Sequence, residues 1–85
     1  MRSALLLVRL WADVVTQKDR KLLGAGIRKY RKRLRLTQER LAEKVDLNPV
    51  YVGQIERGFR VPTVDVLLRI AKALKVRLRD IVRDL

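Results

Sequence analysis

The sequence predicts an all-α protein, a compact five-helix bundle that follows an additional N-terminal segment. Apolar residues recur at helical spacing through most of the chain, and residues typical of helix starts and ends lie between the periodic stretches. The connections are short and the core region holds no convincing strand, which favours a helical bundle. We divide the chain into an N-terminal apolar extension, residues 1–18, and one domain, residues 19–85.

The apolar extension allows more than one interpretation. Residues 4–15 are predicted as a helix, but the run LLLVRLW could form a short strand instead. Arg9 and Asp13 interrupt the apolar run and no small-residue cleavage site follows, so we do not expect a signal peptide. The segment is therefore extra core, an interface with a second chain, or a chain start assigned too early.

The first helix of the domain is expected to begin after Asp19, acting as its N-cap. Gly24 and Gly26 lower its helix propensity, and we expect them to permit close packing of another helix. Its apolar face comprises Leu23, Ile27, Tyr30 and Leu34. Its opposite face is basic and comprises Arg28, Lys29, Lys32 and Arg33.

A second helix is expected to follow Thr37 as its N-cap. Arg40 takes the third helical position, where a full capping box requires Glu or Gln. The apolar face comprises Leu41, Ala42 and Val45. Asp46 and the next residue form a turn, after which the pattern begins again.

A third helix is expected between Asn48 and Gly58. Asn48 caps it, and Pro49 takes the first helical position, where a missing N–H has no cost. Val52 and Ile55 form the buried stripe. Gly58 stands where a left-handed residue commonly ends a helix.

Two further helices complete the expected bundle. Pro62 and Thr63 open a fourth helix. Its inner face comprises Val64, Leu67, Ile70, Ala71 and Leu74. A fifth, shorter helix is expected over residues 78–84.

Composition restricts the function. The 85 residues include neither cysteine nor histidine, so the usual general base at neutral pH and the commonest metal ligands are missing. We therefore expect no enzyme, no metal site and no cofactor. The 21 basic and 9 acidic side chains give a net charge of +12, of which residues 20–60 carry +8. This balance predicts a polyanionic partner, with nucleic acid ahead of an acidic membrane surface.

Four stretches of the chain, taken in order, resemble one known family. They are LGAGIRKYR, LTQERLAEKV, YVGQIERG and VPTVDVLLRIAKAL. From Leu23 to Leu85 the chain is similar to the lambda-repressor-like, Cro-like helix-turn-helix family, also called the xenobiotic-response-element family. The sequence YVGQIERG also resembles that of the restriction-modification controller proteins within this family. Two positions depart from the family pattern, because Asp46 and Lys75 stand where glycine is usual.

The resemblance implies that the third helix lies in the major groove of DNA while the second crosses the backbone. Base contacts are expected from Asn48, Pro49, Val50, Gly53, Gln54 and Arg57. Phosphate contacts are expected from Thr37, Gln38, Arg40, Tyr51 and Arg60. Arg31 and Glu56 are expected to form a partly buried salt bridge that belongs to the scaffold.

The chemistry of the outward side chains fits these roles. Gln54 can pair with adenine, Arg57 with guanine or phosphate, and Val50 can pack on a thymine methyl. Gly53 would let the helix approach DNA closely. Roles without DNA contact also fit two of these features. Arg57 could complement the negative end of its helix, and the basic face of the first helix could be an ordinary solvated surface.

The sequence thus predicts a DNA-binding transcriptional regulator, either a repressor or an activator. We expect it in the cytoplasm of a prokaryote, associated with the nucleoid, and no small-molecule effector is evident. It would act as a homodimer on an inverted repeat of double-stranded DNA. Candidate interface residues are Leu78, Ile81, Val82 and Leu85. The alternatives are an antitoxin or adaptor that binds a partner protein through residues 5–11, and nonspecific polyanion binding driven by charge alone.

Overall fold

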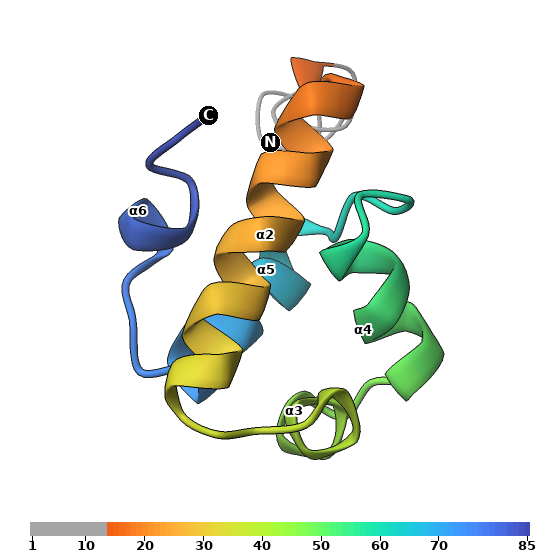
Figure 1. Cartoon of the computed structure of the whole chain (residues 1–85), viewed down its shortest axis with the longest axis vertical. Coiled ribbons are helices and arrows are strands. Elements are labelled where there is room, and N and C mark those ends of the chain that lie inside the picture. Colours follow the sequence, from red (N-terminus) through yellow and green to blue (C-terminus); the bar gives the residue numbers. More distant parts are fainter. Residues whose placement is uncertain (1–13) are drawn as a thin grey trace, which may run out of the picture.

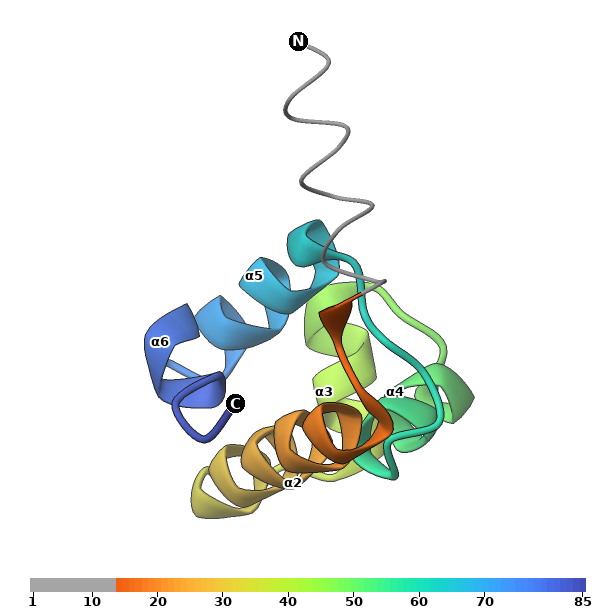
Figure 2. The ribbon, with the colours of Figure 1, turned by 90° about the horizontal axis from the view of Figure 1, so that it is seen from above.

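The computed structural model describes residues 14–85, and the N-terminal extension lies outside this range except for its last five residues. The described part is helical throughout, which confirms the predicted fold class. Its helices are α2 (Gln17–Arg33), α3 (Gln38–Val45), α4 (Pro49–Glu56), α5 (Val64–Ala73) and α6 (Leu78–Ile81). The long α2 runs down the middle of Figure 1, with α3 and α4 on one side, α6 on the other and α5 behind it. Seen from above, α5 starts beside one end of α3 and runs toward α6 (Figure 2).

The first helix begins three residues earlier than the sequence predicted. Thr16 is the N-cap: its hydroxyl accepts the Asp19 N–H at 3.1 Å, and its own N–H donates to the Asp19 carboxylate at 3.1 Å. Asp19 is therefore wrong as the N-cap and is the third helical residue of a capping box, a role that a carboxylate fills by reaching back. The expected boundary between residues 18 and 19 falls inside the first turn of α2.

The starts of α3, α4 and α5 lie where the sequence predicted them. Thr37 accepts the Arg40 N–H at 3.0 Å, and Thr63 accepts the Val66 N–H at 3.2 Å. Asn48 caps α4, with Pro49 in the first turn. The hydrogen bonds confirm these three caps. Each cap needs only a side chain and a backbone N–H two or three residues away, so the local sequence is enough to predict it.

Three helix ends use left-handed backbone at residues other than glycine. Arg35, Asp46 and Lys75 have φ of 58°, 56° and 59°. At Asp46 the turn is closed by Leu47, whose N–H donates to the Ala42 carbonyl at 2.9 Å. A matching 3.0 Å bond closes the turn at Lys75. Both departures from the family's usual glycine thus keep the reversal that satisfies the last carbonyls of a helix.

The last helix is shorter than expected. It covers four residues, Leu78–Ile81, and not residues 78–84. Short helices depend on packing for their stability, and Ile81 is the buried residue of this one at 3% exposure. Beyond Ile81 the side chains are partly or fully exposed, so continuing the helix would bury little more.

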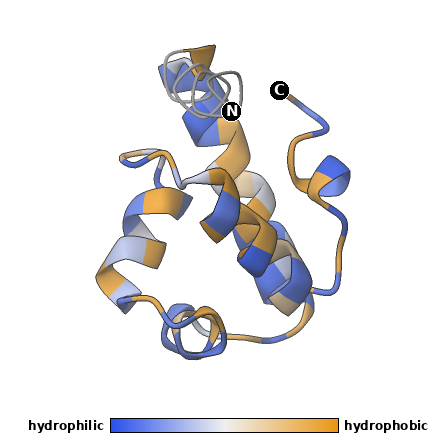
Figure 3. Ribbon diagram, turned by 180° about the vertical axis from the view of Figure 1, so that it is seen from behind, coloured by the Kyte–Doolittle hydropathy of each residue, from blue (hydrophilic) through white to orange (hydrophobic). Residues whose placement is uncertain are grey.

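The core joins side chains from all five helices. Figure 3 shows the alternating apolar and polar bands that such amphipathic helices carry. The α3–α4 unit is closed by buried apolar residues from both helices, and α2 and α5 cover it. The largest fully buried side chains are Leu23, Ile27, Leu41, Ile55, Leu67, Ile70, Leu74, Val52 and Pro62.

Gly24 marks the closest approach of α2 to α4. A Cβ atom at this position would overlap the carbonyl oxygens of Ile55 and Glu56, which are backbone atoms that cannot rotate away. Gly26 is less crowded, since a Cβ there would lie 3.2 Å from the Ile81 carbonyl oxygen. The two glycines therefore serve close helix packing, and Gly24 sets how the end of α4 sits on α2.

Candidate nucleic-acid interface

A shallow hollow of about 280 Å³ lies between the start of α3 and one side of α4. Its lining comprises Gln38, Glu39, Pro49, Val50, Gly53 and Arg57. Every lining residue except Glu39 was predicted to contact a base or a phosphate. The structure therefore brings one predicted phosphate contact, Gln38, next to four of the six predicted base contacts, which is the arrangement that a groove and its adjoining backbone require.

The predicted base-contact residues differ in how freely they are presented. Val50 is 64% exposed, and Arg57 and Pro49 are also exposed. Gln54 is half-buried. Asn48 is exposed, but its side-chain oxygen accepts the Val50 N–H at 2.8 Å as part of the cap. The Asn48 side chain therefore keeps its amide N–H groups and one remaining lone pair of its oxygen for a base.

Gly53 lines the α3–α4 hollow but is itself buried. It lies beneath the Gln38 side chain, whose Oε1 would be 3.4 Å from a Cβ at Gly53. A Cβ at this position would only reach ordinary van der Waals contact with Gln38, so Gln38 occupies the space above Gly53 that the sequence argument assigned to DNA. The α3–α4 crossing decides this, because it places the first residue of α3 over the middle of α4.

Arg31 and Glu56 form the buried ion pair that the resemblance implied. Arg31 Nε and Nη2 donate to the two Glu56 carboxylate oxygens at 2.7 and 2.9 Å, and their side chains are 9% and 2% exposed. Arg31 Nη1 also donates to the Leu36 carbonyl at 2.8 Å. The Glu56 charge is thus neutralised inside the protein, where it does not repel a phosphate on the surface.

The same carboxylate reaches the predicted interface through Gln38, a link that the sequence did not reveal. Gln38 Nε2 donates to Glu56 Oε1 at 3.1 Å. Because a carboxylate only accepts hydrogen bonds, this contact defines which end of the Gln38 amide points inward. The second N–H of that amide is left for another acceptor, which suits a phosphate oxygen.

The remaining predicted phosphate contacts lie at or near the surface. Thr37, Arg40 and Arg60 are exposed, and Tyr51 is half-buried. Arg40 pairs with Glu43 at 3.4 Å, but both side chains are more than 70% exposed, so this ion pair is weak and DNA could displace it.

Phe59 and Glu39 were not predicted as site residues. Phe59 is 69% exposed directly after the turn at Gly58, and the Arg57 guanidinium carbon lies 5.0 Å from its ring centroid. An aromatic residue in the polar turn ERGFR is the sequence signal that could have drawn attention to it. Glu39 lacked such a signal, because an acidic residue in the first turn of a helix is ordinary.

The predicted dimer-interface residues are unequally available. Ile81 is 3% exposed and belongs to the core of its own chain, so we remove it from the candidate interface. Leu78 and Val82 are partly buried against that core. Leu85 is 43% exposed and remains fully available.

The basic face of α2 is exposed at all four predicted positions, and half of it has a structural role. Lys29 and Arg33 lie 5.4 and 5.1 Å from the centroid of the Tyr30 ring. Their side chains therefore cover an aromatic residue of the core, which agrees with a face that is partly scaffold.

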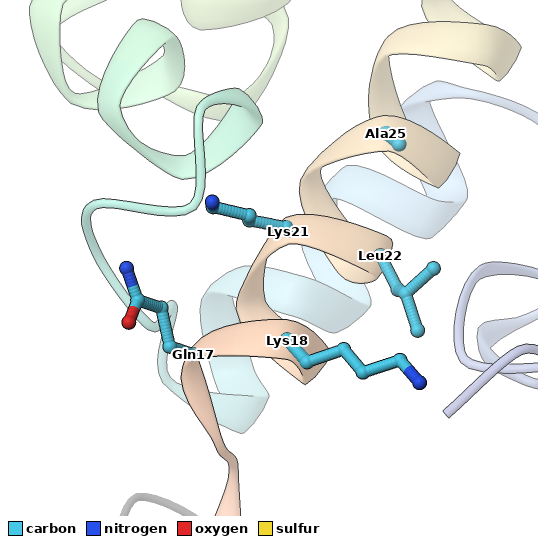
Figure 4. A pocket seen from close by; sticks show the side chains of 5 residues that line it. All are labelled: Gln17, Lys18, Lys21, Leu22 and Ala25. Atoms are coloured by element: carbon cyan, nitrogen blue, oxygen red, sulfur yellow. The ribbon is translucent and has the colours of Figure 1, made fainter.

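Two larger hollows lie outside this surface. One, of about 580 Å³, is lined by α2 alone through Gln17, Lys18, Lys21, Leu22 and Ala25 (Figure 4). The other, of about 550 Å³, lies between the ends of α3 and α5 and is rich in lysine. There the cations face helix C-termini, whose partial negative charge they offset.

No group of three or more histidine, cysteine, aspartate or glutamate side chains is placed to hold a metal ion within residues 14–85. Over the same range, none of the helices combines the length and the apolar character that a membrane span needs.

Comparison with known proteins places the fold. The sequence pattern of the helix-turn-helix family HTH_3 matches residues 27–81. The control protein C.SmaI of Serratia marcescens is 38% identical over 74% of this chain and 75% of its own length. An uncharacterized HTH-type transcriptional regulator of Mycobacterium tuberculosis is 43% identical over 62% of this chain, which spans 38% of that relative's length.

Among solved structures, the restriction-modification controller protein C.AhdI of Aeromonas hydrophila superposes with a TM-score of 0.73 at 34% identity. The match covers 75% of this chain and 97% of C.AhdI. The clp gene regulator ClgR of Corynebacterium glutamicum has the same TM-score at 30% identity, over 75% of this chain and 82% of that one.

Proposed function

The chain belongs to the HTH_3 helix-turn-helix family, and from this premise we propose that it is a sequence-specific regulator of transcription that binds double-stranded DNA. The observation that carries the proposal is the hollow shared by α3 and α4, whose lining places Gln38, expected to hold a phosphate, beside four residues expected to contact bases. The similarity to controller proteins and HTH-type regulators supports the same function.

In this proposal α4 enters the major groove and reads base edges. Gln54 pairs with adenine and Arg57 with guanine, each worth about 1–3 kcal/mol of discrimination. The exposed Val50 packs on a thymine methyl, while Asn48 and Pro49 at the start of α4 approach the neighbouring base pair. Gly53 contributes indirectly, because Gln38 occupies the space above it.

The phosphates on either side are held by the start of α3 and the turn after α4. The first N–H groups of α3 have no partner within the helix, so they and the Gln38 amide form a donor group for one phosphate. Thr37 and Arg40 flank this group, and Tyr51 and Arg60 reach the backbone from the other side of α4.

A single α4 reads only a few base pairs, so we propose a homodimer on an inverted repeat, acting on DNA in the cytoplasm and nucleoid. The interface would use the C-terminal apolar residues Leu78, Val82 and Leu85, of which Leu85 is the most exposed.

The test is a binding selection from a random duplex library at about 150 mM salt, with the intact protein and with Gln54→Ala. We expect an enriched palindrome whose preference relaxes at one position in each half-site in the variant, because only the base paired with Gln54 loses its reader. Gln17→Ala is the matched control, since it removes an exposed glutamine of α2 that lies outside the α3–α4 hollow.

Equal weak binding to all duplexes would contradict the proposal. It would favour attraction by the net charge of +12 alone, which falls steeply as salt rises.

A further inference from the structure

Phe59 has no explanation in the stability of the fold. At 69% exposure it leaves most of an aromatic ring in water, directly after the helix that the proposed function places in the major groove. Exposed single apolar residues are common, but this one makes a defined contact with a site residue, Arg57.

The backbone that carries Phe59 is held firmly. The Phe59 N–H donates to the Gln54 carbonyl at 2.8 Å, and Arg20 Nε donates to the Gly58 carbonyl at 3.3 Å. Gly58 has φ of +77°, and a Cβ there would lie 3.0 Å from the Lys21 backbone nitrogen. Figure 4 shows Lys21 projecting from α2 toward this turn. The direction in which the ring leaves the backbone is therefore set by contacts with both α4 and α2.

The ring in turn limits where Arg57 can go. The guanidinium carbon lies 5.0 Å from the ring centroid, within the distance at which the face of an aromatic ring attracts a cation. A guanidinium is planar and weakly hydrated, so it can stack on a ring and still offer its N–H groups to another partner. Arg57 also lines the α3–α4 hollow, so the stacked side chain stays on the proposed DNA surface.

We propose that Phe59 is a positioning residue for Arg57. The ring holds the guanidinium in one direction before DNA is bound, so less side-chain freedom is lost when Arg57 meets its base or phosphate. This inference rests on the proposed function, because it assigns a purpose to the stacked pair only if α4 contacts DNA.

The test is a double-mutant cycle on a duplex enriched by the intact protein. Phe59→Leu keeps an apolar side chain but removes the ring, and we expect it to weaken binding about threefold to fivefold. Phe59→Tyr keeps the ring and should bind like the intact protein. In the Arg57→Ala background, Phe59→Leu should have no further effect, because the residue that Phe59 positions is gone.

A second readout uses the free protein and needs no DNA. The Arg57 side-chain protons should show a ring-current shift in NMR spectra that Phe59→Leu abolishes and Phe59→Tyr retains. If Phe59→Leu leaves these shifts unchanged, the inference is overturned whatever the DNA result. If Phe59→Leu weakens binding equally with and without Arg57, the ring touches DNA itself and the positioning role is wrong. If the intact protein enriches no sequence, the proposed function fails instead, and the inference fails with it.

Discussion

At the scale of single residues, Arg31 and Glu56 form a buried ion pair that links α2 to α4. Both carboxylate oxygens and all three guanidinium nitrogens are bonded, to each other, to the Leu36 carbonyl and to Gln38. No side-chain nitrogen or oxygen buried in the described residues lacks a hydrogen-bond partner. A satisfied network of this kind specifies how α2, α3 and α4 fit together, and it becomes costly when one member is removed.

Glu56→Gln tests this role. The amide has nearly the same shape but no charge, so it leaves the Arg31 guanidinium buried without a counterion. We expect a loss of about 3 kcal/mol or more in the free energy of unfolding, measured by thermal or urea denaturation. Glu43→Gln is the control, because it breaks an exposed ion pair and should cost less than about 1 kcal/mol. Equal effects of the two changes would contradict a structural role for the buried pair.

At the scale of helices, two contacts position the ends of the bundle. Gly24 lets α2 touch the last turn of α4, which positions α4 and the α3–α4 hollow on the rest of the domain. At the other end, Ile81 anchors the short α6, which begins with Asp80 bonded to the Arg77 N–H at 3.0 Å. The first contact is steric and the second is partly electrostatic, so they respond to different changes.

Gly24→Ala should destabilise the protein although alanine favours helix by about 1 kcal/mol. The added Cβ would overlap the backbone of Ile55 and Glu56, and overpacking of this kind costs about 1–3 kcal/mol or more. The melting temperature of the variant measures the effect. Gly26→Ala is the matched control, since its Cβ meets only the Ile81 carbonyl at 3.2 Å. The idea of a steric contact fails if Gly24→Ala is as stable as Gly26→Ala.

The start of α6 should respond to acid. The hydrogen bond from the Arg77 backbone N–H, helped by the charges of Arg83 and Arg79, lowers the pKa of Asp80 below its ordinary value of 3.8. A lowered pKa means that the carboxylate stabilises the folded state above pH 3.8 and that this contribution is lost as pH falls through the lowered pKa.

An NMR titration of the Asp80 carboxyl carbon checks this directly. Its midpoint should lie below 3.8, and the protection of α6 amides from exchange, relative to their intrinsic rate at each pH, should fall over the same pH interval. In Asp80→Asn this protection should no longer change over that interval. A midpoint at or above 3.8 would show that the bond to Arg77 does not persist in solution.

At the scale of the whole molecule, charge and apolar surface are separated. The apolar core is enclosed by the helices, and the strong excess of positive charge keeps the surface attractive to a polyanion over distances set by the salt concentration. Among the exposed large apolar side chains of the described residues, Leu85 lies at the C-terminal end and Leu68 lies on α5. A homodimer would need one such surface, and we place it at the C-terminal end.

Leu85→Glu should dissociate the proposed homodimer without unfolding the monomer, because the side chain is 43% exposed. Sedimentation velocity measures the association. The affinity of the variant for a palindromic duplex should fall well below that of the intact, dimeric protein. Leu68→Glu is a matched control with 42% exposure, and it should leave the dimer intact. The opposite result, with Leu68→Glu dissociating the dimer and Leu85→Glu not, would move the interface to α5.

The sequence by itself determined the helices and most of the turns between them. Thr37, Asn48 and Thr63 cap helices through bonds to N–H groups two or three residues ahead, and apolar spacing shows which face each helix buries. These are local properties, so they are visible in a chain read in order. The ion pair of Arg31 and Glu56 could be predicted only from the family resemblance, because the two residues lie far apart in the sequence.

Only the tertiary structure decided how the candidate site is assembled. It put Gln38 over Gly53 and against Glu56, stacked Arg57 on Phe59, and buried Ile81 in its own core. It also showed that α6 ends at Ile81, the last fully buried residue, and not where the apolar pattern ends. Each of these features depends on the angles at which helices cross, and many side chains far apart in the sequence set those angles together.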